Sequence, residues 1–255
     1  KCLKISPKNT LSAAQELYSS GYISYPRTSS QQLPKEIGYK KIITSLYKQN
    51  NHKKSAEFLL NKKVLVPNNG KKADPAHPAI YPTGNVPNFK TTYDTKLYDL
   101  IVKRFFAVFG DEATRETMTV TLDCKKEKFI TKGTTTVENG WFDLYGKYVM
   151  LKEEELPVIN EGDICKIKKL NKLDKETTPP KRFTDASIIK HLEKENLGTK
   201  ATRASIVETL KNRGFIDGKP LRATKLGIRI EETLEKYSPK TTSGNFSTEV
   251  ETRVK

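Results

Sequence analysis

The sequence contains very little cysteine and histidine. Cys2, Cys124 and Cys165 are the only cysteines among 255 residues, and no two stand at the short spacing of a metal motif or a disulfide framework. The three histidines also lie far apart, so the chain has no closely spaced His pair that could bind a metal. We therefore predict no metal site in this chain, and the isolated cysteines indicate a reducing compartment.

Long apolar runs and an excess of acidic charge are also missing. No apolar run approaches the length of a membrane span, and the first residues, KCLKISP, have no signal-peptide core. Lys and Arg number 46 against 30 Asp and Glu, which gives a formal net charge of +16. This excess predicts a polyanionic partner, most simply nucleic acid, and a location in the cytoplasm at the nucleoid, away from membranes. The alternative, that the charge serves only solubility, stays open.

Apolar periodicity changes twice along the chain and predicts an α+β, multidomain protein. Residues 1–112 carry helical patterns and a loop at 66–87 that is dense in Pro, Gly and Asn. Residues 113–180 follow the strand period, and residues 181–255 return to helical patterns. Because the chain begins without Met and ends inside a helical pattern, we expect a piece of a longer protein.

Turn and cap residues place the elements more closely. Ser6-Pro7 predicts a helix start and Gly21 its end, with a short strand following at 22–25. Further strands are expected in the second region, at 118–122, 129–137, 141–149 and 164–170. In the third region a helix from Thr184, a helix from Thr202, a hairpin and another helix predict a winged helix-turn-helix.

In the stretch GYISYPRTSS a tyrosine precedes an arginine by two residues, and three residues with hydroxyl groups follow the arginine. A deprotonated tyrosine oxygen can accept a phosphoryl group as a covalent intermediate. Tyr25 and Arg27 stand two residues apart, so on a strand both would point to the same side, where a guanidinium suits a phosphate. Thr28, Ser29 and Ser30 would add neutral donors. The other interpretation is a strand and turn with a half-buried tyrosine.

The stretch DPAHPAIYPT places His77 between prolines, on a loop that we expect to be rigid. In such a position a histidine can hydrogen-bond a phosphate or pass a proton. The alternative is a histidine that only fixes its own loop.

The stretch NLGTKATRASI sets basic residues and hydroxyl groups at a predicted helix start. Lys200 and Arg203 flank the helix N-terminus, which itself favours phosphate, and Thr199 and Thr202 offer hydroxyl groups there. The alternative is a helix start that merely faces solvent.

Taken together, these three stretches resemble type IA DNA topoisomerases. GYISYPRTSS is similar to that family's active-site tyrosine motif and AHPAIYPT to its histidine segment. RFTDASIIKHLEKENLGTKATRASIVETLKNRGFI is similar to a long segment that follows the gate-forming domain, and GNFSTEVETRV to a later one. The stretches stand in the family's order and cover nearly the whole chain. The YPRT and GTKATR sequences are most similar to those of archaeal members.

The resemblance implies roles for individual residues. Tyr25 matches the nucleophile that joins the 5′-phosphate of a cleaved single strand, and Arg27 the arginine that positions and neutralises that phosphate. His77 matches the active-site histidine, and Thr202 a threonine that contacts DNA. Such an enzyme cleaves one DNA strand, passes another through the gap and rejoins the first without ATP.

The chain departs from the family pattern at several positions. Bacterial members often have aspartate where this chain has Ser29, and arginine and serine where it has Thr199 and Ala201. The phosphate contacts of that loop therefore do not transfer one to one, and Lys200 or Arg203 stands in as the expected cation.

The resemblance also implies a domain division: an active-site tyrosine domain with a winged-helix-like, helical fold at 1–112, part of a β-rich gate or hinge domain at 113–180, and part of a winged-helix-like DNA-binding domain at 181–255. Nothing here resembles the family's acidic Toprim domain or its C-terminal zinc ribbons. We therefore expect Mg²⁺ to bind the full-length enzyme outside this chain. The chain alone would be a monomer that binds single-stranded DNA without relaxing it, with Tyr25 exposed.

Other functions remain as alternatives. A non-catalytic winged-helix DNA-binding protein would share the charge and the third region, and the parent protein could be a reverse gyrase. Rolling-circle nickases need a His-hydrophobe-His pair, and tyrosine recombinases place their tyrosine last, so the sequence disfavours both.

Overall fold

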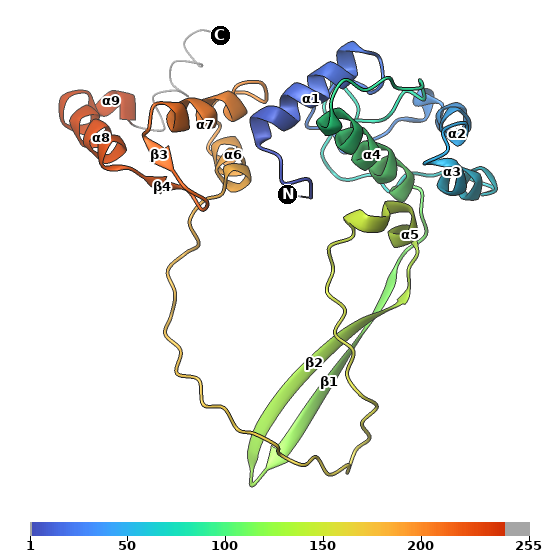
Figure 1. Ribbon diagram of the computed structural model, residues 1–255, viewed down its shortest axis with the longest axis vertical. Coiled ribbons are helices and arrows are strands. Elements are labelled where there is room, and N and C mark those ends of the chain that lie inside the picture. Colours follow the sequence, from blue (N-terminus) through green and yellow to red (C-terminus); the bar gives the residue numbers. More distant parts are fainter. Residues whose placement is uncertain (1, 243–255) are drawn as a thin grey trace.

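The computed structural model describes residues 2–242. Figure 1 shows two helical units next to each other and a long hairpin that projects away from the first unit. The first unit contains α1 to α4, the second contains α6 to α9, and an extended connector joins the hairpin region to the second unit. Helices and antiparallel strands occur together, as predicted. The segment GNFSTEVETRV lies outside the described residues.

Helix α1 (Pro7–Ser19) begins where the sequence predicts. The Ser6 hydroxyl oxygen accepts a hydrogen bond from the Asn9 backbone N–H, and proline occupies the first turn, where a missing N–H costs nothing. The buried residues of α1 are Ala13, Ala14 and Leu17.

The core of the first unit forms between α1 and three further helices, α2 (Tyr39–Tyr47), α3 (Lys53–Leu60) and α4 (Thr92–Ala107). A short 3₁₀ turn, η1 (Lys35–Ile37), precedes α2. A capping box fixes the start of α4. The most deeply buried large side chains of this core are Leu17, Ile23, Ile43, Leu46, Leu59, Tyr98, Val102 and Phe106.

The prediction of a short strand at residues 22–25 is wrong. The structure has a single bridge there, between Ile23 and Pro82. The Thr83 N–H donates to the Tyr22 carbonyl, so the backbone groups of this stretch pair with the loop at 66–87 instead of a sheet. That loop has little regular secondary structure and is held to the first unit by backbone hydrogen bonds.

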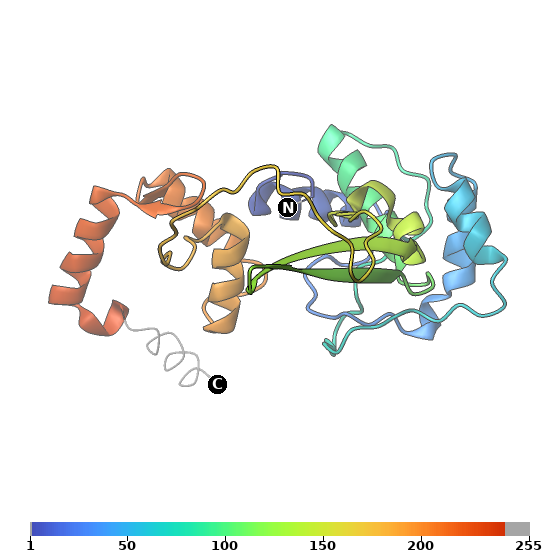
Figure 2. The ribbon, with the colours of Figure 1, turned by 90° about the horizontal axis from the view of Figure 1, so that it is seen from below.

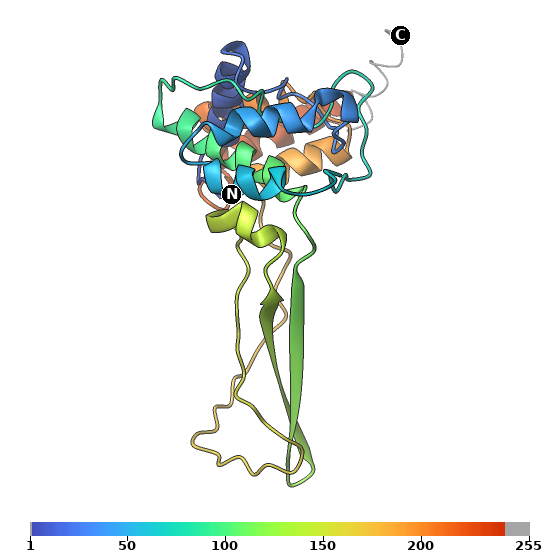
Figure 3. The same cartoon turned by 90° about the vertical axis from the view of Figure 1, so that its right-hand side faces the viewer.

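The hairpin consists of β1 (Thr114–Cys124) and β2 (Glu127–Glu138), paired antiparallel with Val120 opposite Thr131. Figure 3 shows it extending away from the helices. Its tight turn is made by Lys125 and Lys126, whose φ angles are +51° and +71°. Most residues on both faces are exposed, so the hairpin buries little of its own surface.

The prediction of a strand at residues 141–149 is also wrong. The segment forms α5 (Trp141–Tyr145) followed by a 3₁₀ turn, η2 (Gly146–Tyr148). Its apolar residues Trp141, Leu144, Tyr145 and Tyr148 recur at helical rather than strand spacing, and Leu144 is buried in the core of the first unit. Helix α5 therefore packs against α4 and anchors the base of the hairpin.

The strand expected at residues 164–170 does not form either, because this segment is exposed and has no pairing partner within residues 2–242. The second region is therefore β-rich only in β1 and β2. Residues 172–181 form an extended polar connector. Among the described residues, no helix has the length and apolar character needed to cross a membrane.

The second unit contains α6 (Asp185–Lys194), α7 (Arg203–Asn212), and the strands β3 (Ile216–Asp217) and β4 (Arg222–Ala223). It continues with α8 (Lys225–Tyr237) and α9 (Pro239–Thr242). Thr184 caps α6 and β3 pairs antiparallel with β4, so the predicted order of helices and hairpin is confirmed.

Helix α7 contacts α1, and this contact brings the second unit against the first. In Figure 2, α1 lies between the second unit and the rest of the first unit. The turn after α1, which carries Tyr25, therefore lies near the loop between α6 and α7.

Candidate active site

The turn that carries Tyr25 is held by the loop at residues 66–87. The Ser24 N–H donates to the Tyr81 carbonyl at 2.9 Å, and the Tyr81 N–H donates to the Ser24 hydroxyl oxygen at 2.9 Å. This reciprocal pair aligns the tyrosine turn with the segment that contains His77. Two motifs about fifty residues apart in sequence thereby become one site.

The ring of Tyr25 lies between two other rings. Its centroid is 4.5 Å from that of His77 and 5.2 Å from that of Tyr18, which lies on α1. The expectation that Tyr25 would be exposed is wrong, because these neighbours leave it half-buried. Its position is therefore set by packing before any ligand arrives.

Arg27 reaches the hydroxyl group of Tyr25. Its Nη1 donates to the Tyr25 hydroxyl oxygen at 3.5 Å, a long hydrogen bond, and its Nε is buried without a partner among the described residues. The sequence analysis expected Tyr25 and Arg27 to lie close together on a strand. In the structure they lie close together on a turn. The guanidinium thus keeps donors that an anion could take.

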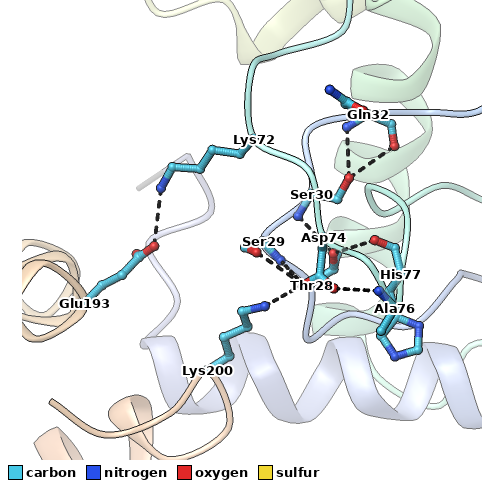
Figure 4. A network of polar contacts seen from close by, with 10 residues as sticks. All are labelled: Thr28, Ser29, Ser30, Gln32, Lys72, Asp74, Ala76, His77, Glu193 and Lys200. Carbon is cyan, nitrogen blue, oxygen red and sulfur yellow. Dashed lines mark hydrogen bonds and ion pairs between the residues drawn. The ribbon is translucent and has the colours of Figure 1, made fainter. Parts of the chain in front are cut away.

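The three hydroxyl groups after Arg27 bind protein groups. The Thr28 hydroxyl donates to the His77 carbonyl at 3.2 Å, and the Ser29 hydroxyl donates to Asp74 Oδ2 at 3.1 Å. The Ser30 hydroxyl donates to the Gln32 carbonyl at 3.4 Å. Figure 4 shows that the contacts of Thr28 and Ser29 join the two loops, whereas the contact of Ser30 lies within its own loop. In this structure, therefore, they hold the site in shape.

The polar groups of the α6–α7 loop form a second network. The hydroxyl groups of Thr199 and Thr202 lie 3.1 Å apart, and the Thr199 N–H donates to the Thr202 oxygen at 2.8 Å. Arg203 donates from Nε to the Leu197 carbonyl and from Nη2 to the Gly198 carbonyl, both at 2.9 Å. The side chain of Arg203 therefore fixes the loop that precedes its own helix.

A cleft of about 650 Å³ opens between the tyrosine turn and the α6–α7 loop. Predicted residues from both sides line it, while His77 lies behind Tyr25 and is not part of the lining. Thr28, Ser30 and Thr202 are also outside the lining. The predicted site residues that line the cleft are Tyr25, Arg27, Ser29, Thr199, Lys200 and Arg203.

One carboxylate joins the two networks across this cleft. Asp74 Oδ2 accepts from Lys200 Nζ at 2.5 Å, and Asp74 Oδ1 accepts from the Ala76 N–H at 3.1 Å. The Lys200 ammonium, helped by the backbone N–H groups of Ala76 and Ser29, holds the pKa of Asp74 well below its usual range. Asp74 is therefore a charged group beside a cleft that Arg27, Lys72, Arg203 and Glu193 also line.

The comparison with protein families shows to which family the chain belongs. A family model described as DNA topoisomerase matches residues 1–255. The chain belongs to the DNA topoisomerase family. The type IA resemblance carried by the motifs is thereby confirmed.

Curated relatives of this topoisomerase chain agree with that assignment. DNA topoisomerase 1 of Pyrococcus horikoshii is 46% identical over 252 residues, which cover 98% of this chain and 37% of that protein. DNA topoisomerase 1 of Methanocaldococcus jannaschii is 45% identical over 98% of this chain and 33% of its own length. Human DNA topoisomerase 3-alpha is 33% identical over 84% of this chain and 21% of its own length.

A solved structure shares the fold of the topoisomerase chain. Full-length topoisomerase I from Thermotoga maritima superimposes with a TM-score of 0.68 at 24% identity, covering 98% of this chain and 42% of that one. The chain thus spans about two fifths or less of the relatives that it matches.

The sequence motifs did not single out Asp74, Lys72 or Glu193 as candidates for this cleft. Asp74 opens the DPAHPAIYPT stretch itself, and its place directly before a proline loop was the available signal. Lys72 and Glu193 line the same cleft, but neither stands in a motif. Only the fold brings them to it.

Proposed function

We propose that this chain carries the strand-cleaving tyrosine of a type IA DNA topoisomerase, with Tyr25 as nucleophile. The observation that carries the proposal is the shared position of Tyr25, Arg27 and His77 at a cleft whose far wall is basic. A half-buried tyrosine in a structural turn needs no arginine at its hydroxyl group and no opposing lysine. A phosphoryl-transfer site needs both, because negative charge develops on the phosphate oxygens.

The chemical step follows from this arrangement. The Tyr25 hydroxyl group releases its proton and its oxygen attacks the phosphorus of a single strand. A phosphorus–oxygen bond forms, and the bond from phosphorus to the 3′ oxygen breaks. The 3′ oxygen takes a proton, and the 5′-phosphate remains on Tyr25. One ester replaces another of similar energy, so the strand can be rejoined by the reverse step without ATP.

The other predicted residues have supporting roles in the proposal. Arg27 binds the phosphate oxygens, and His77 hydrogen-bonds the phosphate or passes a proton. Thr28, Ser29 and Ser30 shape the turn and remain proposed DNA contacts. Thr199, Lys200, Thr202 and Arg203 are the proposed contacts on the far side, at the N-terminus of α7.

The proposed division into a tyrosine domain at 1–112, a gate or hinge part at 113–180 and a DNA-binding part at 181–255 rests on the breaks between helices and hairpin. We propose a winged-helix-like layout for both helical units. In the second, two helices followed by a two-stranded hairpin support it. As a DNA topoisomerase part, the chain would act at the nucleoid as a monomer.

Magnesium belongs to the proposal only for the full-length protein. Within residues 2–242, no three His, Cys, Asp or Glu side chains gather as a metal site would require. The described residues therefore do not fit the ion, and no step above depends on it.

The proposal is tested by trapping the covalent adduct in the full-length protein with a labelled single-stranded oligonucleotide. Tyr25→Phe should abolish the adduct while the noncovalent affinity stays within about twofold, because the ring contacts remain. The control is Tyr18→Phe, which removes a neighbouring hydroxyl group and should leave the adduct intact. An adduct of normal yield from Tyr25→Phe would rule out Tyr25 as the nucleophile. A parent protein that binds the oligonucleotide but forms no adduct would favour the alternative of a non-catalytic DNA-binding protein.

A further inference from the structure

Asp74 is the carboxylate through which the two sides of the cleft meet. Its side chain is only 9% exposed, and its two oxygens accept from the Ser29 N–H, the Ser29 hydroxyl group, the Ala76 N–H and the Lys200 ammonium. Figure 4 shows Lys200 reaching it from the second unit. Three of these donors belong to the first unit and stay in place if Lys200 leaves.

A second ion pair crosses the cleft, and here the first unit supplies the cation and the second unit the carboxylate. Lys72 of the first unit donates to Glu193 of α6 at 3.4 Å, and both side chains are well exposed. An exposed pair of this kind contributes little and is screened by salt. The Asp74–Lys200 pair is shorter and more buried, so it is the stronger of the two links between the units.

The Asp74–Lys200 pair places a negative charge where a polyanion is expected to bind. The chain has a formal net charge of +16, and the same cleft is lined by Arg27, Lys72 and Arg203. A phosphate oxygen and a carboxylate oxygen offer an ammonium group the same kind of charge-assisted hydrogen bond. A phosphate in the cleft could therefore take Lys200, whose side chain is 44% exposed, while Asp74 keeps its donors from Ser29 and Ala76.

We propose that Asp74 is an internal counterion for Lys200, and that a phosphate of the bound single strand displaces it. Asp74 keeps its three bonds within the first unit, and Lys200 transfers to DNA. Binding of the strand then breaks the main ionic link between the units at the moment when the cleft is filled. This inference rests on the proposed function, since it names how the same cleft takes its substrate.

The proposal is tested by a double-mutant cycle in the full-length protein, in a Tyr25→Phe background that prevents covalent chemistry. The probe is a short fluorescent single-stranded oligonucleotide, with binding followed by anisotropy. Asp74→Asn should tighten binding by roughly three- to tenfold, and Lys200→Met should weaken it by a similar factor. With Lys200→Met already present, Asp74→Asn should change affinity less than twofold, because the cation on which Asp74 acts is gone.

Two further measurements keep the test decisive. Lys200→Met should reduce the slope of log affinity against log salt concentration by about 0.7, the value for one phosphate contact on a single strand. Asp111→Asn removes the same charge from an ion pair with Lys62 outside this cleft and should change affinity less than twofold.

The outcomes separate the possible failures. Equal tightening by Asp74→Asn with and without Lys200 would show a general charge effect and overturn the counterion proposal. Weakened binding by Asp74→Asn in both backgrounds would show a purely structural role and overturn it too. If Lys200→Met changed neither the affinity nor the salt slope, the counterion proposal would be overturned whatever the effect of Asp74→Asn. If the parent protein fails to bind the oligonucleotide at all, it is the proposed function that fails.

Discussion

The two helical units differ in how they are held together. The first buries a continuous cluster contributed by α1 to α5, including aromatic residues such as Tyr98 and Phe106. In the described part of the second unit, Val207 and Leu221 are the buried hydrophobic residues, and neither α6 nor α8 buries any side chain. Similar helical patterns in the sequence have therefore led to very different amounts of core.

This difference corresponds to what each unit contributes to the site. The densely packed unit carries Tyr25, Arg27 and His77, whose relative positions must be fixed if the proposed in-line attack is to occur. The thinly packed unit contributes a basic loop and is linked to the first partly by ion pairs, among them Asp74–Lys200. The proposed binding and release of a strand would require one rigid unit and a second unit that can separate from it.

The sharpest test of the comparison removes one core side chain from each unit. Phe106→Ala should cost about 3–5 kcal/mol of unfolding free energy, because a fully buried ring leaves a cavity. Val207→Ala removes two methyl groups and should cost about 1–2 kcal/mol. Urea unfolding followed by fluorescence of Trp141, the single tryptophan, reports the first unit, and hydrogen exchange of α7 reports the second.

Exposed Phe58 provides the control, and Phe58→Ala should cost less than about 1 kcal/mol. If Val207→Ala destabilised its unit as strongly as Phe106→Ala destabilises the first, the contrast in packing would be refuted.

A smaller effect is expected where glycine meets packed backbone. Gly140, at the start of α5, has a φ of +46°, and an added Cβ would overlap the Glu112 carbonyl oxygen. Gly214, in the second unit, has a φ of +69° and open space around it. Gly140→Ala should therefore cost about 3 kcal/mol and Gly214→Ala about 1 kcal/mol, measured as shifts in thermal unfolding. Equal shifts would mean that the two surroundings are equally tight.

The smallest predicted effect concerns pH. Burial among the rings of Tyr98 and Phe106 lowers the pKa of His52, although Asp99 opposes the shift. Below about pH 6.5 the unfolded chain binds a proton that folded His52 resists, so stability falls as the pH drops from there towards the folded pKa. His52→Leu should make the melting temperature less sensitive to pH between 7.5 and 5.5.

The matched control is His191→Leu in the second unit, where the side chain is half exposed. It should leave the pH dependence as it is in the parent protein. A His52→Leu protein that keeps the full pH dependence would show that another group is responsible.

Local signals were enough to predict much of the fold. Caps and apolar periodicity placed α1, α6, α7 and α8, because each helix has its start signal and its apolar face within its own sequence. The segment at 141–149 was misassigned because its aromatic residues suit a strand, while their spacing of three and four suits the helix that packs on α4. The segment at 164–170 alternates but found no partner strand.

The site was predicted in part for the same reason. Tyr25, Arg27 and His77 stand in recognisable motifs, so the sequence could bring them forward as candidates. Asp74 bonds a residue 126 positions away, and Glu193 belongs to an ordinary helix, so only the folded chain reveals that they meet. A local sequence pattern cannot predict contacts between residues that lie so far apart in the chain.

The turn at Lys125 and Lys126 has a consequence for the hairpin as a whole. Where one face of a sheet is buried, sliding a strand by one residue would turn apolar side chains to water, and that cost fixes the alignment. Because β1 and β2 are largely exposed on both faces, a slip would carry little such penalty. The alignment of some twenty residues therefore depends mainly on two lysines in a left-handed conformation, a backbone state that asparagine and glycine would hold more readily.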